Sequence, residues 1–204
     1  DQWDWEKIIT AEDRNVDYLK ATVRSIFGAV KRTAKGVSEK YPQIEICLPE
    51  QIVFITTQQL LDKYPNLTAK QREYEAVKEY GAVFLMQIGG KLTNGEKHDG
   101  RAPDYDDWTL NGDILLYNKV LDSAFEISSM GIRVDRNALM KQLKEENAED
   151  RMEFEFHKML VSGALPLTIG GGIGQSRLCM YLLQKAHIGE VQVSIWPEKE
   201  IAKC

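Results

Sequence analysis

The sequence predicts an α/β protein of the α+β type, with a mainly antiparallel mixed sheet flanked by helices. Candidate strands come in groups with helices between them, and the regular strand–helix alternation of a parallel sheet is missing. The chain has 204 residues, of which 43% are hydrophobic and 28% charged. That composition supplies enough apolar surface for one sizeable core and is typical of a folded globular protein.

The first residues alternate between polar and aromatic side chains. On a strand, this alternation places Gln2 and Asp4 on one face and Trp3 and Trp5 on the other. The polar face could simply be solvated, or it could meet a ligand. The pattern alone leaves both interpretations open.

Residues 10–88 show patterns of both helices and strands, in no regular order. Apolar residues recur at helical spacing over 10–40, and Thr68 with Gln71 has the spacing of a capping box at the start of a later helix. The elements expected here are a helix over 10–40, a strand over 51–57, helices over 58–63 and 68–80, and a buried strand over 82–88.

The second half of the chain opens with a polar, glycine-rich stretch over 89–108, which predicts a long loop. Loops of that length within a domain are uncommon and often functional. The elements expected after it are strands over 110–117 and 124–134, helices over 136–144 and 148–161, a strand ending near residue 170, a helix over 175–185 and a strand over 191–195.

A run of four glycines interrupted by one isoleucine occupies residues 170–174, between a predicted strand and a predicted helix. No Lys-Ser or Lys-Thr follows, which excludes a P-loop, and Arg177 stands where a dinucleotide fingerprint has its third glycine. Backbone at Gly172 and Gly174 could approach a flat ligand closely, and Arg177 could pair with phosphate. A glycine-rich turn beside a surface arginine is the alternative.

Acidic residues gather between positions 98 and 113 and could belong to a solvated loop. Asp113, however, is expected to begin one strand and Glu126 to lie in the next. Carboxylates on neighbouring strands can hold Mg²⁺ when phosphates complete its coordination. Gly131 interrupts the second strand and could form a bulge that redirects Arg133, which could otherwise form an ion pair within the sheet.

Charge and cysteine content narrow the possible partners. The net charge of −5 gives no basic footprint for nucleic acid, and no run of 18 apolar residues could span a membrane. The three cysteines are widely spaced, with no CxxC pair, which favours a reducing compartment over a zinc site or a disulfide scaffold. We therefore expect a cytoplasmic protein that binds neither nucleic acid nor membranes.

Several motifs together resemble the ammonia-dependent aspartate–ammonia ligases, the A-type AMP-forming asparagine synthetases, whose catalytic core is similar to that of class II aminoacyl-tRNA synthetases. The matching segments are Asp-Gln-Trp-Asp-Trp-Glu at 1–6, Gly-Ala-Val-Phe-Leu at 81–85, Arg-Ala-Pro-Asp-Tyr-Asp-Asp-Trp at 101–108, Leu-Asn-Gly-Asp-Ile-Leu at 110–115, Ser-Ser-Met-Gly-Ile-Arg-Val at 128–134, and residues 168–178. The resemblance implies one catalytic domain over residues 1–204. It also implies that the family's N-terminal segment and a loop near 108–110 are missing, either by truncation or because they are mobile.

The resemblance further implies that L-aspartate, ATP and ammonia react to give L-asparagine, AMP and pyrophosphate through a β-aspartyl-adenylate, with Mg²⁺ as cofactor and a homodimer as the assembly. The residues implied for aspartate are Gln2, Asp4, Asp106 and Arg101. Those implied for the nucleotide are Asp113, Glu126, Ser129, Arg133, Gly172, Gly174 and Arg177, with Asp113 and Glu126 also holding the metal. Arg177, Asp106 and Arg133 would be catalytic, with Asp106 as a general base for ammonium.

Two other functions stay open. An aspartyl- or asparaginyl-tRNA synthetase core would activate its amino acid without ammonium, but the acidic balance and the motif at residues 1–5 argue against it. An inactive paralogue would bind an adenylate or another protein as a regulator. The presence of Asp113, Glu126, Arg133 and Arg177 argues against that function.

Overall fold

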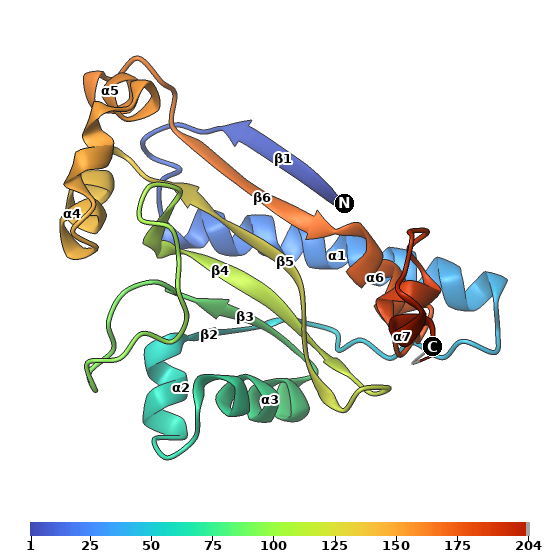
Figure 1. The fold of residues 1–204 in the computed structure, drawn as a ribbon. Coiled ribbons are helices and arrows are strands. Elements are labelled where there is room, and N and C mark those ends of the chain that lie inside the picture. Colours follow the sequence, from blue (N-terminus) through green and yellow to red (C-terminus); the bar gives the residue numbers. More distant parts are fainter. Residues whose placement is uncertain (203–204) are drawn as a thin grey trace.

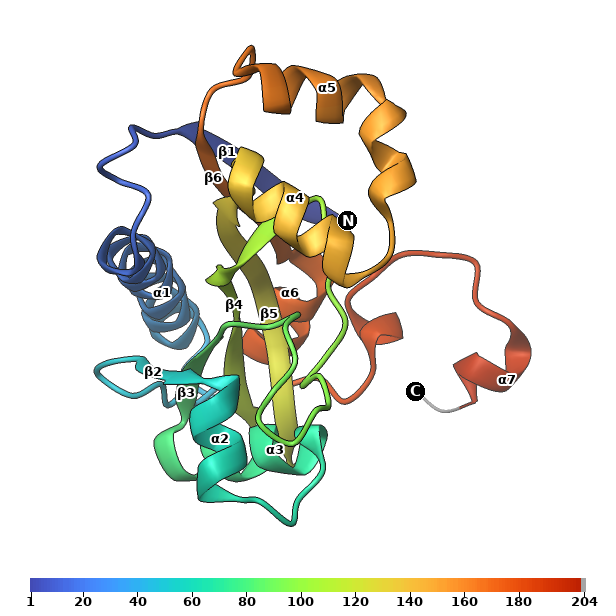
Figure 2. The same cartoon turned by 90° about the vertical axis from the view of Figure 1, so that its left-hand side faces the viewer.

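The computed structural model describes residues 1–202 and has a six-stranded sheet at its centre, with helices on both faces (Figures 1 and 2). The strands are β1 (Gln2–Ile8), β2 (Val53–Thr56), β3 (Ala82–Met86), β4 (Asp106–Asn118), β5 (Ser123–Arg133) and β6 (Thr168–Gly174). The helices are α1 (Val16–Lys40), α2 (Thr57–Lys63), α3 (Ala69–Tyr80), α4 (Arg136–Glu145), α5 (Glu155–Ser162), α6 (Gln175–Leu182) and α7 (Glu198–Ile201), with short 3-10 helices η1 (Glu149–Glu153) and η2 (Ile188–Glu190).

The strands lie in the order β1-β6-β5-β4-β3-β2. Every neighbouring pair is antiparallel except β2 and β3, which are parallel and joined through α2 and α3. The prediction of a mainly antiparallel mixed sheet flanked by helices is therefore confirmed. Strands far apart in sequence become neighbours, so β1 at the N-terminus pairs with β6 near the C-terminus.

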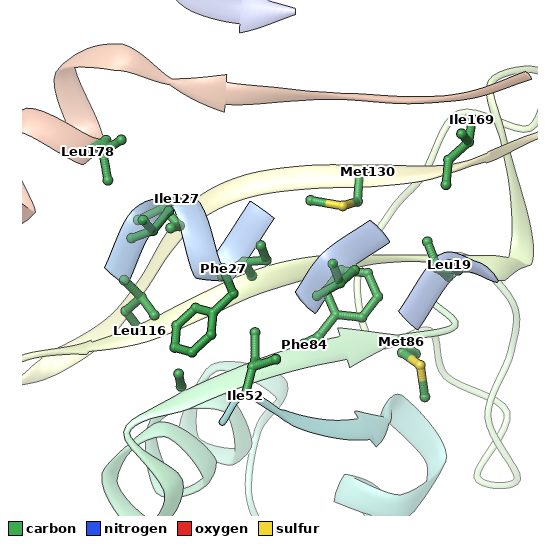
Figure 3. Packing of buried hydrophobic residues seen from close by; sticks show 14 of the residues in the cluster. Leu19, Phe27, Ile52, Phe84, Met86, Leu116, Ile127, Met130, Ile169 and Leu178 are labelled. Carbon is green, nitrogen blue, oxygen red and sulfur yellow. The ribbon is translucent and has the colours of Figure 1, made fainter. Parts of the chain in front are cut away.

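Helix α1 packs against one face of the sheet and lies behind its middle strands in Figure 1. It begins after Asn15, whose side chain accepts a hydrogen bond from the backbone N–H of Tyr18. Its buried residues recur every three or four positions and form the apolar stripe that the sequence predicts. Figure 3 shows Phe27 of this stripe among sheet side chains such as Phe84 and Leu116.

Helices α2 and α3 cover only part of the opposite face. Their side chains pack against β3 and the adjoining end of β4 in a second apolar cluster, which includes Leu60, Val77, Val83, Leu85 and Leu115. Both helices begin with complete capping boxes, as the sequence predicts for Thr68. The part of this face formed by β1, β6 and β5 lies outside that cluster and is where polar residues gather.

Truncating the side chain of Phe84 is expected to cost about 3–5 kcal/mol of unfolding free energy, because it is fully buried and leaves a cavity when removed. Urea denaturation of Phe84→Ala would measure the loss. Val193→Ala is the control, since Val193 is fully exposed and should change stability by less than about 0.5 kcal/mol. A similar cost for both variants would contradict the placement of Phe84 in the core.

Four local predictions are wrong. The helix expected over 148–161 is broken at Phe154, whose backbone is extended, into η1 and α5. Residues 191–195 form no strand, because no neighbouring strand covers Val193 and Ile195, which are fully exposed. Strand β4 begins at Asp106, inside the predicted loop. The glycine run lies within β6 rather than in a turn.

None of the helices within residues 1–202 combines the length and the apolar character needed to cross a membrane. The longest, α1, has 25 residues but carries charged side chains throughout its solvent face.

Candidate active site

Polar side chains form a row across four strands on the face that α2 and α3 leave free. In the ladder, Asp4 is opposite Gly172, Gly172 is opposite Ser129, and Ser129 is opposite Asp113. Directly opposite residues in antiparallel strands project to the same face. Gln2 joins the row, because strand residues alternate and it lies two positions before Asp4.

A cavity of about 650 Å³ lies over this row. Nine of the site residues suggested by the sequence line it: Gln2, Asp4, Arg101, Asp106, Glu126, Ser129, Gly172, Gly174 and Arg177. Asp113 and Arg133 do not line it. They lie behind the wall, and each forms an ion pair with a lining residue, Asp113 with Arg101 and Arg133 with Asp106.

The glycines of β6 form the floor of the cavity. A Cβ on Gly172 would lie 2.5 Å from Gln2 Oε1 and 2.7 Å from Asp4 Oδ1, and a Cβ on Gly170 would collide with Glu6 and Arg133. Real Cβ atoms do not approach other heavy atoms so closely. The glycines therefore allow side chains from the neighbouring strands to lie across β6, and the interpretation of the run as a simple turn is wrong.

A bulge in β5 brings Glu126 and Ser129 to the same face. Ile114 pairs with Ser128 but Leu115 pairs with Glu126, so Ile127 is an extra residue between them. The extra residue points into the core and restores the alternation for Glu126. The bulge expected at Gly131 is wrong, because Gly131 pairs regularly with both neighbours and the second irregularity lies in β4, between Asp106 and Asn111.

Arg133 joins two acidic residues across the sheet. Its guanidinium donates to Asp106 Oδ1 at 2.5 Å and to Glu6 Oε2 at 2.8 Å, and it lies 4.1 Å from the ring centre of Tyr105. Burial raises the pKa of Asp106 although Arg133 opposes the shift. For Glu6, burial is outweighed by the hydrogen bonds from Arg133, which lower its pKa. Arg133 therefore forms ion pairs within the sheet, which was the alternative that the sequence left open for it.

Asp113 is buried beside Arg101, with which it forms a close ion pair. Burial raises the pKa of Asp113 to about 6, the charge of Glu126 adds to the shift, and Arg101 opposes it. Its Oδ1 has no hydrogen-bond partner among residues 1–202. An orphaned carboxylate oxygen near a second carboxylate fits a hard cation such as Mg²⁺. No group of three or more acidic, histidine or cysteine side chains in the described chain could hold a metal alone, so phosphate oxygens would have to complete the shell.

The pH dependence of stability should report on Asp113. Its folded pKa of about 6 exceeds the ordinary value of 3.8, so the folded state holds the proton more tightly. The stabilisation this provides is present below about pH 4 and is lost as the pH rises through 6. Relative to Asp113→Asn, the wild type is expected to lose unfolding free energy between about pH 4 and about pH 6 in urea titrations. Parallel pH profiles for the two proteins would contradict the burial of this carboxyl.

Arg177 lies at the start of α6, where the helix opens onto the cavity. Gly174 precedes the helix and offers no capping side chain, and Ser176 and Arg177 of the first turn line the cavity. Arg177 Nη1 donates to the Glu126 backbone carbonyl at 3.1 Å and lies 3.6 Å from its carboxylate, yet the side chain is 52% exposed. A helix N-terminus and an accessible guanidinium both favour an anion.

The sequence reasoning missed several residues at the site, among them Glu6, Tyr105, Ile188 and Gln192. Glu6 continues the alternation of Gln2 and Asp4, and that period could have identified it. Tyr105 follows Asp104 in a motif already quoted, but its contact with Arg133 depends on the fold. Ile188 and Gln192 line the cavity from a segment without any pattern that indicates it.

Comparison with known proteins identifies the relatives of this chain. The family model for aspartate–ammonia ligases matches residues 1–204. An aspartate–ammonia ligase of Clostridium perfringens is 62% identical over 204 residues, all of this chain and 61% of the relative. One of Clostridium tetani is 63% identical, over all of this chain and 60% of the relative. The chain thus spans about three fifths of the length of these curated relatives.

Solved structures show the fold class. An aspartyl-tRNA synthetase of Entamoeba histolytica matches with a TM-score of 0.61 and 18% identity, over 93% of this chain and 41% of the other. An asparaginyl-tRNA synthetase of Pyrococcus horikoshii complexed with asparaginyl-adenylate matches with a TM-score of 0.61 and 17% identity, over 93% of this chain and 45% of the other. The predicted class II synthetase-like fold is confirmed. The family match over the whole chain and the identity to these ligases show that the chain belongs to the aspartate–ammonia ligase family.

Proposed function

We propose that the protein carrying this chain amidates L-aspartate with ammonia at the expense of ATP, giving L-asparagine, AMP and pyrophosphate. The observation that supports this most strongly is the cavity over the sheet, which is lined both by carboxylates and by the guanidinium groups of Arg101 and Arg177. Asp4 and Asp106 suit the ammonium group of an amino acid. Arg177 at the start of α6 suits the phosphates of a nucleotide. Membership of the aspartate–ammonia ligase family supports the same reaction.

At the amino-acid end, Asp4 and Gln2 would bind the α-ammonium group and Arg101 a carboxylate of aspartate. The β-carboxylate oxygen would attack the α-phosphorus of ATP, and the bond to pyrophosphate would break to leave β-aspartyl-adenylate. Ammonia would then form the C–N bond while AMP leaves and one proton is lost. Burial raises the pKa of Asp106, which suits a general base at this step.

At the nucleotide end, Arg177 would stabilise negative charge as pyrophosphate departs. Asp113 and Glu126 would hold Mg²⁺, which supplies charge neutralisation for the phosphates when bound. Gly172 and Gly174 leave the floor open to the nucleotide, and Ser129 faces it from β5. Arg133 would act on the nucleotide from behind Asp106, as a third arginine at the site.

We also propose that residues 1–204 form one catalytic domain, that the complete protein is a homodimer, and that it works in the cytoplasm. Cys47 and Cys179 are free thiols, which suits a reducing compartment; Cys204 lies outside the described residues. The missing N-terminal segment and the missing loop near 108–110 stay predictions. Light scattering on the full-length protein would measure the oligomeric state.

The proposed reaction is tested by AMP release from the full-length protein with Mg-ATP and aspartate, with and without ammonium. We expect AMP that depends on ammonium, with an equal amount of asparagine. Aspartate-dependent pyrophosphate exchange without ammonium, together with charging of tRNA, would indicate a synthetase instead. Adenylate binding without any turnover would indicate a regulator.

Asp4→Asn is expected to raise the KM for aspartate by about tenfold or more, while the KM for ATP changes by less than about twofold. The reason is that Asp4 lines the cavity and is assigned to the ammonium group of aspartate, whereas Arg177 is assigned to the phosphates of ATP. Steady-state kinetics with each substrate varied would measure both constants. Asp62→Asn is the matched control, because Asp62 is an exposed residue of α2 outside the cavity. A larger rise in the KM for ATP than in the KM for aspartate would contradict the assignment of Asp4 to aspartate.

A further inference from the structure

The loop over residues 87–105, between β3 and β4, forms one wall of the cavity. It contributes Gly100, Arg101, Ala102 and Tyr105, and Arg101 also pairs with Asp113. Within this loop only an isolated bridge between Lys91 and Lys97 gives regular backbone pairing. Arg101 therefore needs support from outside the loop to keep a defined position.

A buried histidine supplies the first link between this loop and the rest of the protein. His98 Nε2 lies 3.0 Å from Oε1 of Glu73, on α3, and the two side chains are only 1% and 7% exposed. His98 Nδ1 has no hydrogen-bond partner among the described residues. A hydrogen on Nε2 fits this arrangement, because Nε2–H then donates to the carboxylate of Glu73.

Lys70, one turn before Glu73 on α3, supplies the second link. Its ammonium donates to both carboxylate oxygens of Glu73, at 3.0 and 3.1 Å, and lies 3.8 Å from Asp99. Asp99 in turn accepts a hydrogen bond from the backbone N–H of Gly100 at 2.7 Å. The two links thus hold the loop up to the residue that precedes Arg101.

The same side of α3 borders the active site. A second cavity, of about 350 Å³, lies between α3 and the β4–β5 hairpin; it is lined by Lys70 and Glu73 on one side and by Glu126 and Arg177 on the other. Glu126 and Arg177 also line the main cavity. A buried carboxylate costs stability unless it is paired, and Glu73 is paired with both Lys70 and His98.

We propose that Glu73 and His98 are positioning residues that fix the loop so that Arg101 meets Asp113 and faces the substrate. This inference rests on the proposed function, in which Arg101 binds a carboxylate of aspartate. The two residues touch no substrate. They act through the short stretch from His98 to Arg101, and Lys70 supports them by holding Glu73 and Asp99 together.

A double-mutant cycle on the full-length enzyme tests the inference. Glu73→Gln removes the charge that holds His98 and Lys70, and it is expected to raise the KM for aspartate by about tenfold. In an Arg101→Gln background, the same substitution should change that KM by less than about twofold, because the residue through which it acts is already gone. Glu79→Gln is the matched control: it is on the same helix and pairs with Lys63, away from the loop. Effects of Glu73→Gln that multiply with those of Arg101→Gln, or that equal those of Glu79→Gln, would overturn the proposal.

Hydrogen exchange gives a readout that does not depend on turnover. Glu73→Gln and His98→Gln are expected to speed amide exchange in residues 97–102 by about tenfold or more, and by more than they speed exchange in β3. Glu79→Gln should leave the loop as in the wild type. If the wild type forms no AMP while these exchange changes appear, the proposed reaction fails and the loop anchoring stands. Unchanged exchange in both variants would overturn the anchoring whatever the activity.

Discussion

Arg177→Ala is expected to lower AMP formation by about 100-fold or more while the protein remains folded. Arg177 is half exposed, and its only close partners among the described residues belong to Glu126, so its guanidinium can turn to a phosphate without leaving a buried charge behind. It also sits in the first turn of α6, where the helix dipole favours the same anion. Arg177→Ala removes both the hydrogen-bond donors and the positive charge, and it should therefore slow the step in which pyrophosphate leaves.

The effect is measured as kcat for ammonium-dependent AMP release, with circular dichroism to confirm folding. Arg177→Lys should recover only part of the rate, since lysine keeps the charge but cannot bind phosphate in two places at once. Arg136→Ala is the matched control, because Arg136 is an exposed arginine in the first turn of α4. Near-normal turnover of Arg177→Ala would remove Arg177 from the mechanism.

Local chemistry made much of the fold predictable. The capping box at Thr68 and the stripe along α1 are properties of short sequence windows, and the structure confirms both. The errors occurred where tertiary contacts decide. Val193 and Ile195 have strand-forming side chains but no neighbouring strand, and hydrophobic periodicity after residue 147 does not reveal that the chain is extended at Phe154.

The sequence could predict which residues belong to the candidate site, but not which of them form ion pairs with one another. Alternation alone placed Gln2 and Asp4 on one face of a strand, and both line the cavity. The ion pair of Arg133 with Glu6 joins positions 127 residues apart, and no local pattern reports such a distance. For the same reason, the sequence could not show that Asp113 is buried behind Arg101.

The glycine run shows why register matters. Glycine is disfavoured in strands, so four glycines in five residues predict a turn when the neighbours are unknown. In the sheet, Gly170 lies opposite Glu6, whose side chain extends over it. Gly172 lies opposite Asp4, and the side chains of Asp4 and Gln2 extend over it. These side chains occupy the space that a Cβ on β6 would need, so only glycine fits at these two positions.

Gly172→Ala is accordingly expected to raise the KM for aspartate by about tenfold to 100-fold with little loss of folded protein. The added methyl would lie 2.5 Å from Gln2 Oε1 and 2.7 Å from Asp4 Oδ1, so both side chains must move away from the floor. Gly36→Ala is the control, because a methyl there meets no atom within 4 Å and should stabilise α1 by up to about 1 kcal/mol without changing the KM.

The same variant separates two ways in which the glycines could serve the reaction. If the floor acts by letting Gln2 and Asp4 reach aspartate, the KM for aspartate rises and that for ATP changes little. If it acts by admitting the nucleotide directly, the KM for ATP rises first, because the methyl then intrudes on the ligand rather than on β1. Unchanged constants for both substrates would mean that β1 shifts to absorb the methyl, and the closeness of Gln2 and Asp4 to β6 would then have no part in binding.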